Sequence, residues 1–204
     1  MRLLRVSFAI LLGLVFSVAG SRATTTVVFP SFELNRFGSE ELVKLDDFAG
    51  SIVILDFFAY WCVPCRKVSS DLEEYVQKFY TAKGGNAAGF PVQVVSMNIE
   101  QGRAAKTRQY IKQTGVNLVL DDVGGKVYQS LNGRGIPYVV VLTETAGGSH
   151  WEISYSHTGY EGYEKVREVI DSIRPDDPQA IRPLDKPTPD VAIPSAHGLE
   201  IGTD

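Results

Sequence analysis

The only two cysteines of this chain, Cys62 and Cys65, are separated by two residues and follow an apolar run. That run, residues 51–58, holds a single acid, Asp56, among β-branched and aromatic side chains. Thiols at this spacing form a disulfide reversibly, and their reactivity depends on how readily the thiolate forms. The pattern therefore indicates redox chemistry, with a carboxylate buried shortly before the sulfur pair.

The cysteine pair lies where a predicted strand, residues 51–58, meets a predicted helix, residues 65–80. Unpaired N–H groups and the helix dipole favour a thiolate at a helix N-terminus, so Cys62 is the expected nucleophile. Cys65, one turn further, is expected to face the interior and to release a mixed disulfide. Pro64 suits the first helical turn. One apolar stripe of the helix is expected to hold Val68, Leu72, Tyr75, Val76 and Phe79.

The rest of the chain alternates strands and helices and then finishes in a hairpin. An edge hairpin is expected before residue 50, and a turn at Gly147-Gly148. The order predicts an α/β fold in which helices flank a mixed central sheet. The further expected strands are 92–99, 137–142 and 150–155, and the further helices are 101–115, 124–132 and 161–173.

Two simpler interpretations of the cysteines are weaker. A purely structural disulfide would close a four-residue loop, which stabilises a fold by about 2 kcal/mol at most. A zinc site requires about four ligands, and the other candidates are His150, His157 and His197. We therefore expect no metal, and no cofactor beyond a Cys62–Cys65 disulfide.

The two ends of the chain differ from its middle. Residues 1–23 have the basic, apolar and small-residue layout of a signal peptide, with an uncleaved membrane anchor as the alternative. Residues 174–204 contain six of the ten prolines and no aromatic residue, which predicts a disordered tail or a handle for a partner. Residues 24–173 remain for one domain. Export would place the cysteines in an oxidising compartment.

Composition argues against nucleic-acid binding. The 204 residues are 44% hydrophobic and 22% charged, as in an ordinary globular domain. The formal net charge of −4 leaves no surplus of basic residues to neutralise phosphates.

The stretch "WCVPC" after "LDFFAY", followed much later by "GIPYVVVL", resembles the thioredoxin fold, a three-layer sandwich. Within that fold it is similar to the exported TlpA, ResA and cytochrome c maturation reductases, over roughly residues 30–173. The long insertion with a helix around 103–114 is similar to theirs. The resemblance implies a cis bond at Ile136-Pro137, in a loop that pairs with an extended substrate; a trans proline starting a strand is the alternative. Gly159 resembles the family's glycine beside the active site.

The resemblance also assigns roles to single residues. Burial should raise the pKa of Asp56, and the resemblance implies that Asp56 accepts the proton of Cys65 through a water. The alternative is a strand-end acid held by backbone donors, and the TlpA and ResA branch often has Asn here. Trp61 is expected to shield the cysteines and contact substrate, or else simply to pack. The expected substrate-binding residues are Trp61, Val63, Pro64, Ile136, Pro137 and Tyr138.

These features predict an exported, monomeric thiol-disulfide oxidoreductase that mainly reduces disulfides in client proteins. The resemblance implies a membrane thiol protein as electron donor, and clients of the cytochrome c or copper-centre maturation type. A disulfide oxidase or isomerase is the first alternative. A copper-carrying or redox-sensing module, or an adaptor that survives mutation of both cysteines, are alternatives of a different class.

Overall fold

The structure, a computed structural model, describes residues 28–29, 31–145 and 150–174. The predicted signal segment 1–23, the Gly147-Gly148 turn and the predicted tail from residue 175 onward lie outside the described residues. None of the helices in the described ranges is long and apolar enough to cross a membrane.

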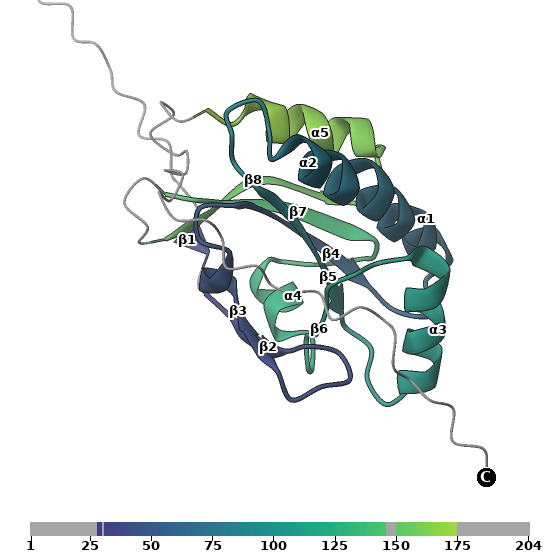
Figure 1. The fold of residues 1–204 in the computed structure, drawn as a ribbon. Helices are drawn as coiled ribbons and strands as arrows, with labels where there is room; N and C mark the ends of the chain where they lie inside the picture. The colour runs from purple at the N-terminus through teal and green to yellow at the C-terminus, as the bar shows by residue number, and fades with distance from the viewer. Residues whose placement is uncertain (1–27, 30, 146–149, 175–204) are drawn as a thin grey trace, which may run out of the picture.

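A six-stranded mixed sheet forms the centre of the domain, as the alternation of strands and helices predicted (Figure 1). The middle strand β4 pairs in parallel with β5 and antiparallel with β7. β6 extends the sheet beyond β5, and β8 followed by β1 extends it beyond β7. In order across the sheet the strands are β1 (Val28–Phe29), β8 (Trp151–Thr158), β7 (Tyr138–Glu144), β4 (Ile52–Phe58), β5 (Val92–Asn98) and β6 (Val119–Asp121).

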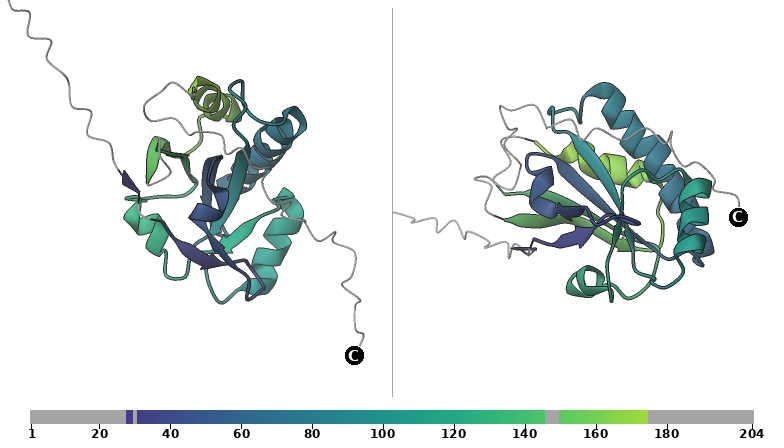
Figure 2. Two further views of the ribbon diagram at one scale, coloured as in Figure 1. Left: turned by 60° about the vertical axis from the view of Figure 1, so that its left-hand side comes forward. Right: turned by 60° about the horizontal axis from the view of Figure 1, so that its bottom comes forward.

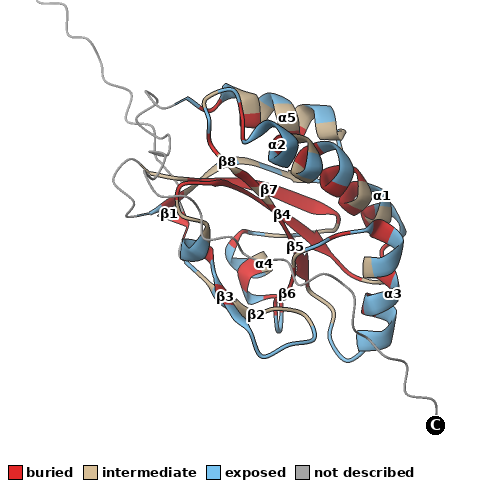
Figure 3. Ribbon diagram, viewed as in Figure 1, coloured by how far each residue is buried: buried red, intermediate tan, exposed pale blue. Residues whose placement is uncertain are grey.

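Layers of side chains cover both faces of this sheet. All seven residues of β4 are buried, which explains why its sequence is an apolar run interrupted only by Asp56 (Figure 3). Because strand side chains alternate, Ile52 and Ile54 face one layer while Val53 and Leu55 face the other. The fold is thus the three-layer sandwich that the sequence predicted.

One face packs against α1 (Val63–Leu72), α2 (Lys78–Lys83) and α5 (Tyr163–Ser172), which stay side by side in every view (Figures 1 and 2). The other face packs against the 3₁₀ turn η1 (Leu45–Phe48) and α4 (Lys126–Ser130). α3 (Ala104–Thr114) packs against α1 near the cysteine end. The expected edge hairpin forms a separate two-stranded sheet of β2 (Glu33–Asn35) and β3 (Leu42–Lys44).

The predicted single helix 65–80 is wrong in its middle. A π-helical turn, η2 (Glu73–Gln77), separates α1 from α2. The wider turn shifts the apolar stripe, so Tyr80 is 1% exposed in the core while Tyr75 is 44% exposed. Periodicity at 3.6 residues per turn therefore misassigned Tyr75 and missed Tyr80. It also missed the short strands β1 and β6.

Candidate functional site

The cysteine pair occupies the N-terminus of α1. Cys62 is the N-cap residue, and Pro64 lies in the first turn. The two sulfurs are joined by a disulfide, and the backbone N–H of Cys65 donates to Cys62 Sγ over 3.3 Å. A helix-terminal N–H thus already points at the sulfur that would carry negative charge after reduction.

Burial differs between the cysteines and the residues around them. Cys65 is fully buried and Cys62 is 4% exposed, both in a cluster with Phe58 and Tyr110. Trp61 is 54% exposed, and its indole N–H donates to Glu100 Oε2 over 2.9 Å. Val63 and Pro64 are exposed as well, so the predicted contact residues beside Cys62 form an accessible rim.

The proline loop lies beside the same cluster. The Ile136-Pro137 peptide bond is cis. Ile136 packs against the cluster that holds both cysteines, and the N–H of Gly159 donates to the carbonyl of Pro137 over 2.8 Å. The structure therefore brings Ile136, Pro137 and Gly159 to the cysteine end of the sheet.

Tyr138 departs from its predicted role in substrate binding. It is the first residue of β7 and is only 6% exposed. Its ring stacks on Phe57 at 5.7 Å, and its hydroxyl donates to the carbonyl of Leu131 over 2.8 Å. Side chains alternate along a strand, and the side chain of Tyr138 lies on the face of the sheet that packs against η1 and α4. Tyr138 thus supports the core and is not available to a docked chain.

Asp56 lies in the middle of β4, fully buried. Its Oδ2 accepts a hydrogen bond from the hydroxyl of Ser69 over 2.5 Å, while Oδ1 has no partner among the described residues. Ser69 lies one turn after Cys65, on the same face of α1. The carboxylate is therefore held by a side chain of the cysteine helix, rather than by the backbone donors of the alternative interpretation.

Ser69 and Tyr110 extend this contact into a chain of three side chains. The hydroxyls of Ser69 and Tyr110 are 2.7 Å apart, so Tyr110 can donate to Ser69 while Ser69 donates to Asp56. The Tyr110 ring stacks on Phe58 at 4.3 Å. Only indirect signals of these partners can be found in the sequence: a serine beside the apolar stripe of α1, and a single aromatic ring in the polar helix α3.

Burial controls the acid–base properties of the hydrogen-bonded side chains of Asp56, Ser69 and Tyr110. Removal from water raises the pKa of Asp56 to about 7, although the hydrogen bond from Ser69 acts in the opposite direction. Burial, and secondarily the nearby Asp56, raise the pKa of Tyr110 well above its ordinary range. Asp56 is thus poised to gain or lose a proton near neutral pH, while Tyr110 stays neutral.

Metal binding finds no support in the described part of the chain, where no group of three or more His, Cys, Asp or Glu side chains is placed to hold an ion. His197 lies outside the described residues.

A sheet with a CxxC disulfide at the start of a covering helix, facing a cis-proline loop, is the architecture of a thioredoxin-like protein. Residues 50–147 match the family model described as thioredoxin-like.

Particular relatives are thiol-disulfide oxidoreductases. The chain is 23% identical over 137 residues to the thiol-disulfide oxidoreductase ResA of Halalkalibacterium halodurans, covering 67% of this chain and 70% of the relative. The crystal structure of a putative thiol:disulfide interchange protein DsbE from Chlorobium tepidum has 26% identity and a TM-score of 0.57, over 72% of this chain and 95% of that one. A secreted thiol-disulfide isomerase from Corynebacterium glutamicum has 18% identity and a TM-score of 0.58, over 77% and 96%, and so shares the fold.

Proposed function

We propose that this domain is an exported thiol-disulfide oxidoreductase that mainly reduces disulfides in client proteins. The observation that carries the proposal is the Cys62–Cys65 disulfide at the N-terminus of α1, with the N–H of Cys65 donating to Cys62 Sγ. The similarity to ResA and to the DsbE protein supports the same chemistry. Export rests on the predicted signal segment and on the secreted relative.

In the reduced protein, the Cys62 thiolate attacks one sulfur of a client disulfide and releases the other as a thiolate. The buried Cys65 then attacks Cys62 Sγ, breaks the mixed disulfide and releases the second client sulfur. Two electrons pass to the client, and the Cys62–Cys65 disulfide forms again. An upstream thiol donor of the kind that the resemblance implies would restore the dithiol.

Asp56 is proposed to accept the proton that Cys65 loses in the second step. Its burial and its pKa of about 7 suit a group that must be ionised for part of the cycle. Asp56→Asn should slow release of the client near pH 7 while Cys62 still forms the mixed disulfide. Rapid-quench thiol labelling separates these two steps, and an unchanged release rate would remove Asp56 from the mechanism.

Trapping in cells tests the proposal directly. Cys65→Ser should hold clients on Cys62 as mixed disulfides, whereas Cys62→Ser should hold none. The trapped proteins, identified by mass spectrometry, would show whether the clients are cytochrome c or copper-centre maturation proteins. Absence of mixed disulfides, together with a tight Cu(I) complex, would favour the copper-carrying alternative.

The direction of electron flow is tested by the reduction potential. A reductant should have a potential near that of thioredoxin, roughly −270 mV, while a strong oxidant lies near −120 mV. Equilibration with glutathione or dithiothreitol buffers measures it. A value close to the oxidising limit would replace the reductase proposal with the oxidase alternative.

A further inference from the structure

A pocket of about 270 Å³ opens beside the cysteine pair, between α1 and α3. Tyr60 and Trp61, just before Cys62, and Arg66, just after Cys65, line its near side. Lys106, Gln109 and Gln113 line its far side. These three follow one face of α3, at positions i, i+3 and i+7. The pocket is therefore lined in part by the residues that directly precede and follow the cysteine pair in the chain.

The lining of the pocket is cationic and polar. No Asp or Glu is among the described residues that line it, whereas Arg66 and Lys106 bring two positive charges. Lys106 Nζ lies over the Tyr60 ring at 5.3 Å, and Arg66 donates to the carbonyl of Tyr60 over 3.0 Å. The buried Nε–H of Arg66 has no acceptor in the described part of the chain. Both cations are thus held at the pocket without an anionic partner among the described residues.

The segment that forms the far side of the pocket is itself basic. From Arg103 to Thr114 the chain around α3 carries four basic residues and no acidic one, although the whole protein has a net charge of −4. The nearby acid, Glu100, is engaged by the indole N–H of Trp61 and does not line the pocket. Two cations at one pocket of a protein with a net negative charge indicate that the pocket favours a negatively charged ligand.

We propose that this pocket binds an acidic side chain of the client, placed a few residues from the client disulfide. The inference rests on the proposed reductase function and adds a rule for its clients. A carboxylate of a polypeptide fits because Arg66 and Lys106 offer N–H donors and charge, Gln109 and Gln113 offer amide donors, and Tyr60 and Trp61 cover its aliphatic part. The subsite takes no part in the covalent steps.

Matched peptides test the proposal. Each peptide carries one cysteine in a mixed disulfide with 2-mercaptoethanol, and has either Glu or Gln at one to three residues on either side. The rate of oxidation of the reduced protein is measured at low and high salt. The best Glu peptide should react about twofold to fivefold faster than its Gln partner, the range of a partly exposed ion pair, and salt should reduce the ratio.

Two exposed lysines of α3 give a variant and its control. Lys106→Ala should bring the Glu/Gln ratio close to one. Lys112→Ala, which removes the same charge outside the pocket lining, should keep the ratio of the wild type. If both variants lost the Glu/Gln preference equally, the preference would come from the overall electrostatic field of α3 and not from the pocket. A Glu/Gln ratio of one in the wild type would overturn the subsite outright.

A neutral substrate separates failure of the subsite from failure of the proposed function. The wild-type dithiol should reduce bis(2-hydroxyethyl) disulfide, which has no charge for the pocket to bind. Reaction with this compound but no Glu preference would overturn the subsite alone. Reaction with neither the compound nor the peptides would overturn the reductase function and the subsite together.

Discussion

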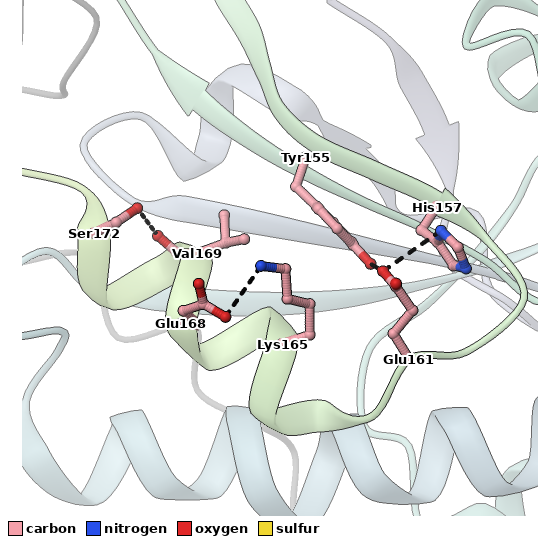
Figure 4. A network of polar contacts seen from close by, with 7 residues as sticks. All are labelled: Tyr155, His157, Glu161, Lys165, Glu168, Val169 and Ser172. Carbon is pink, nitrogen blue, oxygen red and sulfur yellow. Dashed lines mark hydrogen bonds and ion pairs between the residues drawn. The ribbon is translucent and has the colours of Figure 1, made fainter.

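Two tyrosine–carboxylate networks in this domain differ in their distance from water. In the first, Tyr110, Ser69 and Asp56 are each no more than 1% exposed. In the second, Tyr155 on β8 donates to Glu161 over 2.8 Å, and Glu161 also faces His157 Nδ1 at 3.5 Å (Figure 4). The side chains of His157 and Glu161 are 38% and 47% exposed.

The two networks contain similar groups but therefore differ in their effects on stability and on pKa. Water solvates the surface carboxylate whether or not Tyr155 binds it, so that network can add little to stability. The buried carboxylate has only the protein to solvate it, which makes each contact costly to remove and moves its pKa toward neutrality. The comparison teaches that burial, more than the number of hydrogen bonds, decides which network controls chemistry. Four predictions test it.

The largest effect is expected for Asp56→Asn in the oxidised protein, where neither cysteine titrates. The folded-state pKa of about 7 lies above the unfolded value near 3.8, so the folded state retains a proton that the unfolded state has lost. The free energy of unfolding of the wild type should therefore fall as pH rises from 4 to 8, by roughly 4 kcal/mol. Asp56→Asn should flatten this slope. Urea unfolding at several pH values measures it, and an unchanged slope would contradict the burial argument.

Ser69→Ala should have the next largest effect. It removes the 2.5 Å hydrogen bond to Asp56 Oδ2, so the ionised acid keeps only the weaker support of the Ser96 hydroxyl. We expect a loss of about 1–3 kcal/mol above pH 7, a smaller loss at pH 5, and a higher midpoint in the pH profile. Ser70→Ala, at the neighbouring position of α1, is the control. Equal losses at both pH values would mean that Ser69 only packs.

Tyr110→Phe and Tyr155→Phe compare the two networks at one atom each. Both variants retain a ring and lose a hydroxyl. Loss of the buried hydroxyl should cost about 1 kcal/mol and shift the pH midpoint of Asp56 upward, because Ser69 loses its donor. Loss of the hydroxyl on β8 should cost under about 0.5 kcal/mol and leave the midpoint in place. Chemical denaturation across pH gives both quantities, and similar costs would erase the distinction.

Glu161→Gln is expected to be the mildest change. It removes the charge that faces His157 and keeps an acceptor for Tyr155. Exposed pairs of this kind contribute under about 1 kcal/mol, and salt screens them. Thermal unfolding at low and high salt should differ little between this variant and the wild type. A large, salt-sensitive loss would show that the surface network matters more than its exposure suggests.

The sequence alone predicted those parts of the site whose residues are close together in the chain. Cys62, Cys65 and Pro64 lie within one turn, and the apolar run around Asp56 marks a buried strand from its composition alone. The partners of Asp56 could not be predicted, because Tyr110 meets Ser69 across 41 positions through the packing of α3 on α1. A single sequence carries periodicity within an element but little information about which elements touch.

The errors in the fold have a similar cause. Tyr138 was assigned to the substrate groove because it follows Pro137, but the strand pleat turns alternate side chains to opposite faces, and adjacency in sequence does not specify the face. Tyr75, which the predicted stripe included, is exposed, and Tyr80, which it did not include, is buried, because the π-helical turn changes the phase of the helix from Glu73 onward. The strand β6, with three residues, is too short to show a period of its own.

The π-helical turn has a mechanical consequence for the rod formed by α1 and α2. The π-helical turn holds about one residue more than an α-helical turn, so deleting one residue between Glu73 and Gln77 would leave a regular α-helix with Tyr80 still facing the core. Because an α-helix rotates by about 100° for each residue, inserting one residue there would instead swing Tyr80 out toward solvent. The Cys62–Cys65 disulfide at the N-terminus of α1 would keep its position beside the sheet. An insertion in the π-helical turn would therefore loosen the packing of α2 while sparing the cysteine end of α1.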